Sequence, residues 1–427
     1  MSVEKKAPDI RFKGFSGEWE QRNLGELIDI RSAARVHKEQ WTETGVPFFR
    51  TSDVVSIYKG QENAKAFISY DVYKELTDKI GKVSTDDLLV TGGGSIGIPF
   101  LVPNDDPLYF KDADLLWFKN DKRFDGCFLY TFLFSETFKK YIKSISHIGT
   151  IAHYTIQQAK ATPIKQCERA EQTAIGNTFQ KLDSLIKQHQ QKHDKLSHLK
   201  KAMLEKMFPK QGETVPEIRF KGGSGEWKEK PFGACFANLP NNTLSRAELN
   251  YQVGLAKNIH YGDVLIKFGE TLDADSELIP FITNNGVANK LKHTALQSGD
   301  IVIADAAEDN TVGKCTELLN VGELLVFSGL HTIAVRPTLT FASKYLGYYL
   351  NSASYHDQLS SLMQGTKVLS ISKTAIQNTL VVFPKNVEEQ TAIGNYFQKL
   401  DSLINQHQQQ ITKLSNIKQA CLSKMFV

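Results

Sequence analysis

Two segments of this chain occur twice, and this repetition constrains the fold more than any other feature. Residues 8–19 are echoed by residues 216–227, with ten of twelve positions identical. Residues 172–208 are echoed by residues 390–426, with 27 of 37 positions identical and no gap. Internal repeats of this kind predict a fold built from two equivalent halves. The offsets are 208 and 218 residues, so the two intervening regions differ in length.

The regions between the repeats differ in sequence as well. Residues at roughly 20–165 and 228–385 share only a faint pattern, in which a strand-like run such as 87–90 or 299–303 precedes glycines. The chain therefore alternates constant and variable parts. We expect four parts, two domains that include the opening repeats 8–19 and 216–227 and two long helices: 1–167, 168–208, 209–387 and 388–427.

The longer repeat has the apolar spacing of a coiled-coil helix. Its seam positions follow a strict 4-3 pattern, and we expect helix–helix contacts from these residues: Ile175, Phe179, Leu182, Ile186 and Leu196, then Ile393, Phe397, Leu400, Ile404 and Leu414. Further apolar residues widen each stripe: Leu185, Leu199 and Leu204, then Leu403, Ile417 and Leu422. Each seam also contains one lysine, Lys200 or Lys418.

A single amphipathic helix of this length needs a partner for its apolar stripe. The other copy is the natural partner, and an antiparallel pairing would place the two variable domains at opposite ends. A plain dimerising coiled coil is the alternative. The expected fold class is α+β, with mixed and mostly irregular sheets in two domains joined by two long antiparallel helices in a pseudo-twofold arrangement.

Composition narrows the function classes only modestly. The net charge is +4 and the pI about 8.5, which neither requires nor excludes a polyanionic partner. The five cysteines form no CxxC pair, so neither a metal site nor a disulfide framework is expected. No apolar run is long enough for a membrane helix, and the first residues lack a secretory apolar stretch. We therefore expect a cytoplasmic protein.

Two short motifs suggest enzymes, but their contexts argue against that interpretation. Gly92, Gly94 and Gly97 satisfy a dinucleotide-binding spacing, yet a proline and a strand-like run follow where a helix is required. We expect a tight turn there. Residues 106–109 approach the Asp-Pro-Pro-Tyr motif of amino-methyltransferases, but Leu108 replaces the second proline and no cofactor-binding unit intervenes.

The combination of repeats resembles the specificity subunits of type I restriction-modification systems. The resemblance covers essentially the whole chain. It is carried by the duplicated segments Thr173–Asn177 and Phe179–Asp183, by Arg11–Gly14 with Gly17–Trp19 in each opening repeat, and by the Gly-Thr pairs at 149–150 and 365–366.

The resemblance implies that each variable region is a target-recognition domain that reads one half of a split DNA sequence, and that the helices set the spacing between them. It also implies two adenine-N6 methyltransferase subunits and, in the full complex, two restriction subunits. S-adenosylmethionine, ATP and Mg²⁺ would bind those partners, and this chain would carry no catalysis and no cofactor. A solitary DNA reader, a fused methyltransferase and a coiled-coil scaffold remain the alternatives.

Side chains that donate to or accept from base edges and phosphates are the candidate DNA contacts. In the first variable region we expect them at Arg31, Arg35, Lys38, Arg50, Thr51, Ser52, Lys59, Ser95, His147 and Thr150. In the second we expect them at Lys257, Lys267, Asn284, Asn285, Lys290, Lys292, His293, Lys314 and Lys367. Because the two domains share little sequence, the predicted target is asymmetric.

Overall fold

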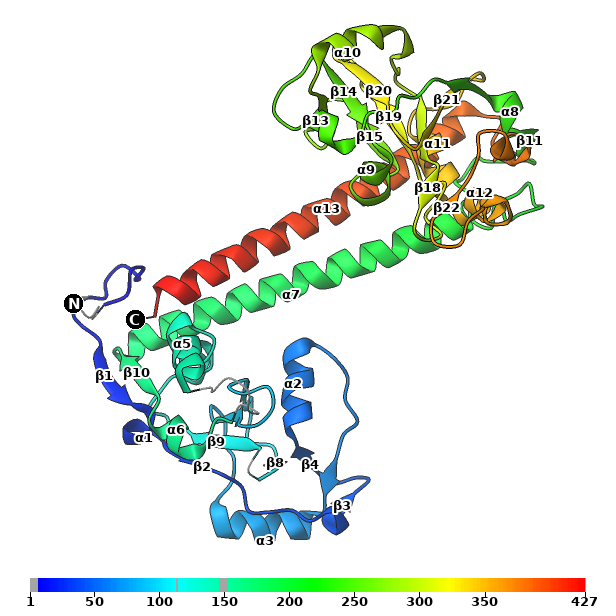
Figure 1. The fold of residues 1–427 in the computed structure, drawn as a ribbon. Helices are drawn as coiled ribbons and strands as arrows, with labels where there is room; N and C mark the ends of the chain where they lie inside the picture. Colours follow the sequence, from blue (N-terminus) through cyan, green and yellow to red (C-terminus); the bar gives the residue numbers. More distant parts are fainter. Residues whose placement is uncertain (1–6, 113, 146–152, 427) are drawn as a thin grey trace. The chain divides into compact units, whose positions relative to one another are not determined.

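The computed structural model describes residues 7–112, 114–145 and 153–426. Its contacts divide the chain into two units, Met1–Gln190 with Gln409–Val427, and Gln191–Gln408. Figure 1 shows the elements of each unit. Each unit takes in part of both long helices, so the packing units do not coincide with the sequence repeats.

The first unit contains two four-stranded sheets and a two-stranded one. The strand orders are β2-β9-β6-β7, β3-β5-β4-β8 and β1-β10. The strands are β1 (Glu20–Asn23), β2 (Asp29–Arg31), β3 (Trp41–Thr42), β4 (Val46–Phe49), β5 (Phe67–Ile68), β6 (Leu88–Thr91), β7 (Pro99–Leu101), β8 (Tyr109–Phe110), β9 (Leu115–Lys119) and β10 (Pro163–Gln166). The helices are α1 (Leu24–Leu27), η1 (Lys38–Gln40), α2 (Thr51–Lys59), α3 (Tyr70–Ile80), α4 (Gly126–Phe132), α5 (Glu136–Ile145) and α6 (Ile156–Lys160).

The second unit has a similar set of sheets with additional strands. The orders are β12-β21-β17-β19-β15, β13-β16-β14-β20, β11-β23 and β18-β22. The strands are β11 (Lys228–Pro231), β12 (Phe236–Leu239), β13 (Leu249–Asn250), β14 (Ala256–Ile259), β15 (Thr271–Asp273), β16 (Phe281–Ile282), β17 (Ile301–Ala304), β18 (Ala306–Ala307), β19 (Cys315–Leu319), β20 (Leu325–Ser328), β21 (Thr332–Pro337), β22 (Leu369–Ser370) and β23 (Leu380–Phe383). The helices are α8 (Phe232–Cys235), η2 (Arg246–Glu248), α9 (Tyr261–Ile266), α10 (Asn285–Lys290), η3 (Lys292–Thr294), α11 (Tyr345–Asn351), α12 (Ala353–His356), η4 (Asp357–Leu362) and η5 (Ala375–Asn378).

The two variable regions therefore have the same topology. In each unit the first sheet is antiparallel through its first four strands, and one strand pair of the second sheet, β4-β8 or β14-β20, is parallel. The second unit adds β15 as a parallel edge strand beside β19. This confirms the α+β class with mixed sheets, and it places much of the length difference between the repeats in local insertions.

The strand-then-glycine pattern of the sequence marks equivalent central strands. All four residues of β6 and all four of β17 are buried, as expected for apolar runs inside a covered sheet. After β6, residues 92–98 form a turn into β7, with Val90 opposite Pro99. The dinucleotide-like glycines thus lie in a strand-to-strand turn, as predicted, and open no helix.

The two long helices are α7 (Arg169–Lys206) and α13 (Val387–Lys424) (Figure 1). In the first unit the start of α7 packs against the end of α13, where the rings of Phe179 and Phe426 lie 6.2 Å apart. In the second unit the start of α13 packs against the end of α7, where Phe397 stacks on Phe208 at 5.9 Å. The helices are therefore antiparallel, as predicted.

Each opening repeat joins the start of one helix to the end of the other. In the first unit, the guanidinium of Arg11 donates two hydrogen bonds to Glu171 in the first turn of α7, at 2.6 and 2.7 Å. The adjacent N–H of Ile10 donates to the carbonyl of Lys424 at the end of α13. The second unit repeats the arrangement: Arg219 donates to Glu389, and the Ile218 N–H donates to the Lys206 carbonyl.

The glutamine after each of these glutamates fastens the helix to its own domain. Gln172 accepts from the backbone N–H of Asp125, and Gln390 accepts from that of Ala342, both at about 3 Å. One turn later, a Cβ on Gly176 would lie 2.7 Å from Asp125 Oδ1, so glycine is needed for this close approach. The repeated residues thus build the same frame twice, and the variable residues are carried on it.

Candidate nucleic-acid interface

Most of the predicted DNA contacts of the first unit lie on its surface. The side chains of Arg35, Lys38, Ser52, Lys59 and Ser95 are exposed, whereas Arg31 and Arg50 are half-buried. Arg31 donates to the carbonyl of Ile80 and pairs with Asp29. His147 and Thr150 lie outside the described residues. All the candidate residues of the first unit remain predicted DNA contacts.

Arg50 is held in place by its neighbours. It caps the start of α2, and its guanidinium donates to both carboxylate oxygens of Asp53 at 2.9 and 3.1 Å. The hydrogen bonds to Asp53 raise the pKa of Arg50. Reaching a phosphate would require Arg50 to exchange an internal ion pair for an external one, so among the described candidates it is a weak one.

The predicted contacts of the second unit are placed less uniformly. Lys267, Asn284, Asn285, Lys290, Lys292, His293 and Lys367 are exposed. Lys267 already binds Asp263 at 3.0 Å and the Tyr251 hydroxyl at 2.6 Å. Asn284 accepts from Gly286 N as the cap of α10, so its side chain has a structural role.

Lys257 is a correction to the sequence prediction. It lies in β14 with 4% of its surface exposed, and its ammonium donates to the carbonyls of Ala274 and Ser276 at 2.9 and 3.0 Å. Burial lowers its pKa. A lysine stem can follow a strand inward when carbonyls replace the water that its ammonium loses, so Lys257 supports the fold and does not face DNA. Lys314 is half-buried and likewise donates to a carbonyl, that of Leu265.

The helix seam residues divide into two groups. Ile175, Phe179, Ile393, Phe397 and Leu400 are buried in the cores of their units, together with the end of the opposite helix. Leu182, Ile186, Leu196, Ile404 and Leu414 are half-buried. Two flanking residues depart from the predicted wider stripe, because Leu199 and Ile417 are 39% and 41% exposed. These two occupy equivalent positions of the repeat, so the exposure is a property of the repeated helix surface.

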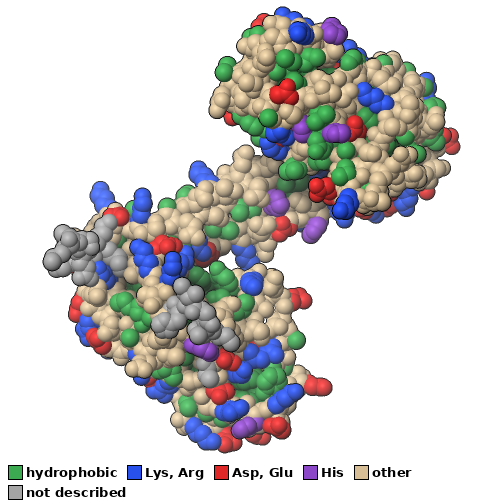
Figure 2. All heavy atoms as spheres, in the orientation of Figure 1, with side chains coloured by type: hydrophobic (Ala, Val, Ile, Leu, Met, Phe, Trp, Pro, Cys, Tyr) green, Lys and Arg blue, Asp and Glu red, His purple; other side chains and the backbone are tan. Residues whose placement is uncertain are grey.

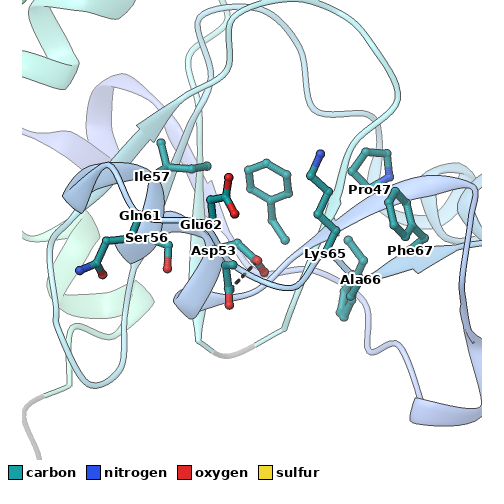
Figure 3. A pocket seen from close by; sticks show the side chains of 12 residues that line it. Pro47, Asp53, Ser56, Ile57, Gln61, Glu62, Lys65, Ala66 and Phe67 are labelled. Carbon is teal, nitrogen blue, oxygen red and sulfur yellow. Dashed lines mark hydrogen bonds between the residues drawn. The ribbon is translucent and has the colours of Figure 1, made fainter. Parts of the chain in front are cut away.

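A pocket of about 570 Å³ lies beside the start of α2 in the first unit (Figure 3). Its walls include Phe67, Ile57 and Pro47, and polar groups such as Asp53 and Lys65 lie at its rim. Asp53 accepts from the side chain of Asn63 at 2.8 Å, so part of the polar rim is satisfied internally.

Charges of both signs lie on the face of the described residues that Figure 2 draws. Figure 2 shows basic and acidic side chains interspersed over the visible face of each unit, in keeping with the small net charge. Among the described residues there is no group of three His, Cys, Asp or Glu side chains placed to hold a metal ion. None of the helices in that part of the chain is long and apolar enough to cross a membrane.

Comparison with known proteins decides the family. Residues 16–198 and 257–416 match the family described as the type I restriction modification DNA specificity domain. The first stretch contains the first variable region, the second contains most of the second variable region, and together they make up most of the chain. The chain belongs to this family. The resemblance seen in the sequence is thereby confirmed, and the chain is a type I restriction-modification specificity subunit.

Relatives agree with this assignment. A type I restriction enzyme specificity subunit of Haemophilus influenzae is 25% identical over 164 residues, which cover 38% of this chain and 40% of that protein. The match thus spans about two fifths of the relative's length. The specificity subunit of M. genitalium has the same fold, with a TM-score of 0.56 and 17% identity, and 99% of each chain is covered.

A second solved structure comes from a study of complex assembly and conformational transition in a type I restriction-modification system. It matches with a TM-score of 0.50 and 17% identity over 98% of each chain. At this identity the likeness concerns the fold alone. The fold of a specificity subunit therefore extends over nearly all of this chain.

Sequence reasoning missed the residues that fix the frame. Arg11 and Glu171 are 160 positions apart, and nothing in their local sequence predicts that they pair. The repeat did contain a signal, because both residues recur at Arg219 and Glu389 in equivalent positions. A charged residue that is repeated together with a charge of opposite sign in a second repeated segment is a candidate partner.

Proposed function

We propose that this specificity subunit reads a bipartite, asymmetric DNA sequence, with one half read by each variable domain. The observation that carries the proposal is a single fold, built twice on repeated residues, whose surfaces differ in chemistry at equivalent positions. A repeated frame keeps the geometry constant, whereas the divergent side chains give each domain its own base preference. Two domains with different base preferences predict an asymmetric DNA sequence.

The chain directs adenine-N6 methylation and restriction that are carried out by partner subunits. Two methyltransferase subunits would bind the duplicated helices equivalently, because repeated surfaces present the same contacts twice. Restriction subunits join in the full complex. S-adenosylmethionine, ATP and Mg²⁺ bind to those partners, and this chain contributes binding and orientation without catalysis. The complex acts on DNA in the cytoplasm.

The experiment compares two hosts by genome-wide mapping of methylated adenine. One host carries this gene with a cognate methyltransferase gene, and the other carries the methyltransferase gene alone. A split, asymmetric motif that is methylated only in the first host is the expected result. A palindromic motif, or identical methylation in both hosts although the subunits copurify, would overturn the proposal.

A control variant distinguishes recognition from assembly. Leu182→Asp places a carboxylate in the half-buried helix seam and should reduce copurification with the methyltransferase, because an unpaired charge among apolar side chains destabilises the packed helices. Where residual complex forms, its methylated motif should be unchanged. A changed motif in an intact complex would show that the helices read sequence.

A further inference from the structure

A groove of about 640 Å³ in the second domain is lined by variable residues. Helix α9 supplies Tyr261 and Ile266, strand β18 supplies Ala306, and the turn after β18 supplies Glu308. His331, which precedes β21, and Val368, in the loop before β22, also line the groove. All of these residues come from segments between the repeats, where the two domains diverge.

The aliphatic residues of this groove are unusually exposed. Ile266 is 84% exposed at the end of α9, and Val368 is 53% exposed. Neither contributes much to a core, so the fold itself does not explain their apolar character. The loop that carries Val368 is held in a tight turn by Gly365, which has φ +120°, and a Cβ at that position would lie 2.0 Å from the Val368 carbonyl oxygen.

The polar residues of the groove are fixed as well. His331 has a left-handed backbone, with φ +54°, and its Nδ1 lies 3.2 Å from Asp305 Oδ1. The ring of Tyr261 meets the His331 ring edge to face at 5.3 Å. Glu308 lies exposed on the turn beside them. The groove therefore offers carboxylate acceptors, an imidazole and two aliphatic side chains within one concave surface.

The first domain has different chemistry at the same positions. Thr51 begins α2 where Tyr261 begins α9, so Ser56 of α2 corresponds to Ile266. Asp114 precedes β9 where His331 precedes β21. The backbone elements correspond, but the side chains differ. The second domain has an aromatic, an aliphatic and an imidazole side chain where the first domain has two hydroxyl groups and a carboxylate. Such exchange on a constant backbone is what different base preferences require.

We propose that this groove contacts the major-groove edge of an A·T pair in the half-site of the second domain, an inference that rests on the proposed function. The carboxylate of Glu308 repels phosphates, so the groove faces bases and not the DNA backbone. A carboxylate accepts from a base amino group, and an aliphatic side chain contacts the thymine methyl. Only an A·T pair presents both an amino donor and a methyl group at that edge.

The first test uses the double variant Ile266→Ser/Val368→Ser in the assembled methyltransferase complex. We expect the methylated motif to lose discrimination at an A·T position of one half-site, while the other half-site and the spacer stay unchanged. The unchanged half-site shows that the variant folds and assembles. Val253→Ser is the matched control, because Val253 is 76% exposed in the same domain but does not line the groove.

The second test replaces thymine by uracil, which lacks the methyl group, at the position identified. The native complex should bind the uracil duplex about fourfold more weakly, as expected for one buried methyl group at about 0.8 kcal/mol. The serine variant should bind both duplexes equally. If the native complex determines a split motif but the double variant leaves every position unchanged, the groove proposal is wrong and the proposed function stands. If the native complex determines no split motif, the proposed function itself fails.

Discussion

The Nζ atom of Lys200 in α7 lies 2.6 Å from Oδ1 of Asp401 in α13. The repeat contains the same pair in exchanged order, because Lys418 of α13 pairs with Asp183 of α7 and both residues are offset by 218 positions. The two pairs differ in their other contacts. Lys200 also binds Glu270 at 2.7 Å, from the segment leading into β15, which has no counterpart in the first unit, and Asp401 accepts from the Tyr348 hydroxyl at 2.7 Å.

Exchanging the charges of each pair should therefore give unequal results. Lys418→Asp/Asp183→Lys restores a pair with the same geometry, so the free energy of unfolding should stay within about 1 kcal/mol of the native value. Lys200→Asp/Asp401→Lys places a new carboxylate beside Glu270, and this repulsion should lower the stability by about 2 kcal/mol or more. Chemical denaturation of the full chain measures both. Equal losses would show that Glu270 does not contribute.

Removing the arginine of either opening repeat should destabilise its unit strongly. Arg11→Ala leaves the fully buried carboxylate of Glu171 without its partner, which costs about 3–5 kcal/mol. Arg11→Ala/Glu171→Gln removes the charge as well and should lose less than the single variant. Denaturation curves give the free energy of unfolding of both variants. Arg219→Ala and Arg219→Ala/Glu389→Gln are the matched variants in the second unit. A double variant that loses as much stability as Arg11→Ala, or more, would contradict a direct coupling.

The corrected placement of Lys257 leads to a separate prediction. Lys257→Met removes the donor to two carbonyls and should lower stability by about 1–3 kcal/mol, but the methylated motif should not change. Lys228, which is exposed in strand β11, is the control, since Lys228→Met removes no buried donor and should have a smaller effect on stability. Thermal melts and methylation maps report the two properties. A relaxed second half-site in Lys257→Met would restore Lys257 as a DNA contact.

Glu317 should make the second unit less stable as the pH rises. Its carboxylate accepts from the backbone N–H groups of Lys344 and Gly347 but is buried, and burial raises its pKa to about 7 from an ordinary value of 4.5. Between these pH values the unfolded chain ionises Glu317 while the folded chain keeps the proton. The folded state is then favoured below pH 4.5 and loses up to about 3 kcal/mol as the pH rises through 7.

Comparison with Glu317→Gln isolates this effect from all other titrating groups. The difference in free energy of unfolding between the native chain and the variant should fall steadily from pH 4 to pH 8. Urea denaturation at several pH values in this range measures it. Parallel profiles for the two proteins would mean that Glu317 ionises alike in the folded and unfolded chains.

Much of the architecture was predictable because repetition in the sequence reports repetition in the fold. The 4-3 spacing of residues such as Phe179 and Phe397 predicted two helices, and the need of each apolar stripe for a partner predicted their antiparallel pairing. Lys200 and Lys418 interrupt the seam, and each forms an ion pair with an aspartate on the opposite helix. Local sequence could not predict that the variable regions share one topology, since their common signal is limited to single strands such as β6 and β17.

The candidate interface was harder to predict than the frame. A sequence identifies basic residues but not the direction of their side chains, so it predicts a surface position for Lys257 although this lysine donates to carbonyls inside the domain. For apolar residues the difficulty is reversed, because an apolar side chain suggests a buried position. Ile266 and Val368 look like core residues in the sequence, and only the fold shows that they line an open groove.

The core of the first unit depends on residues that are translated long after the rest of that unit. Leu422, Met425 and Phe426 pack with Phe179 and Trp19 although the rest of that unit ends at Gln190. At typical synthesis rates of about 5–20 residues per second, the roughly 240 intervening residues take about 10–50 s to make. During that interval the apolar residues at the start of α7 lack their partners from the end of α13. A ribosome that stalls within the second domain would therefore leave the first domain incomplete as well.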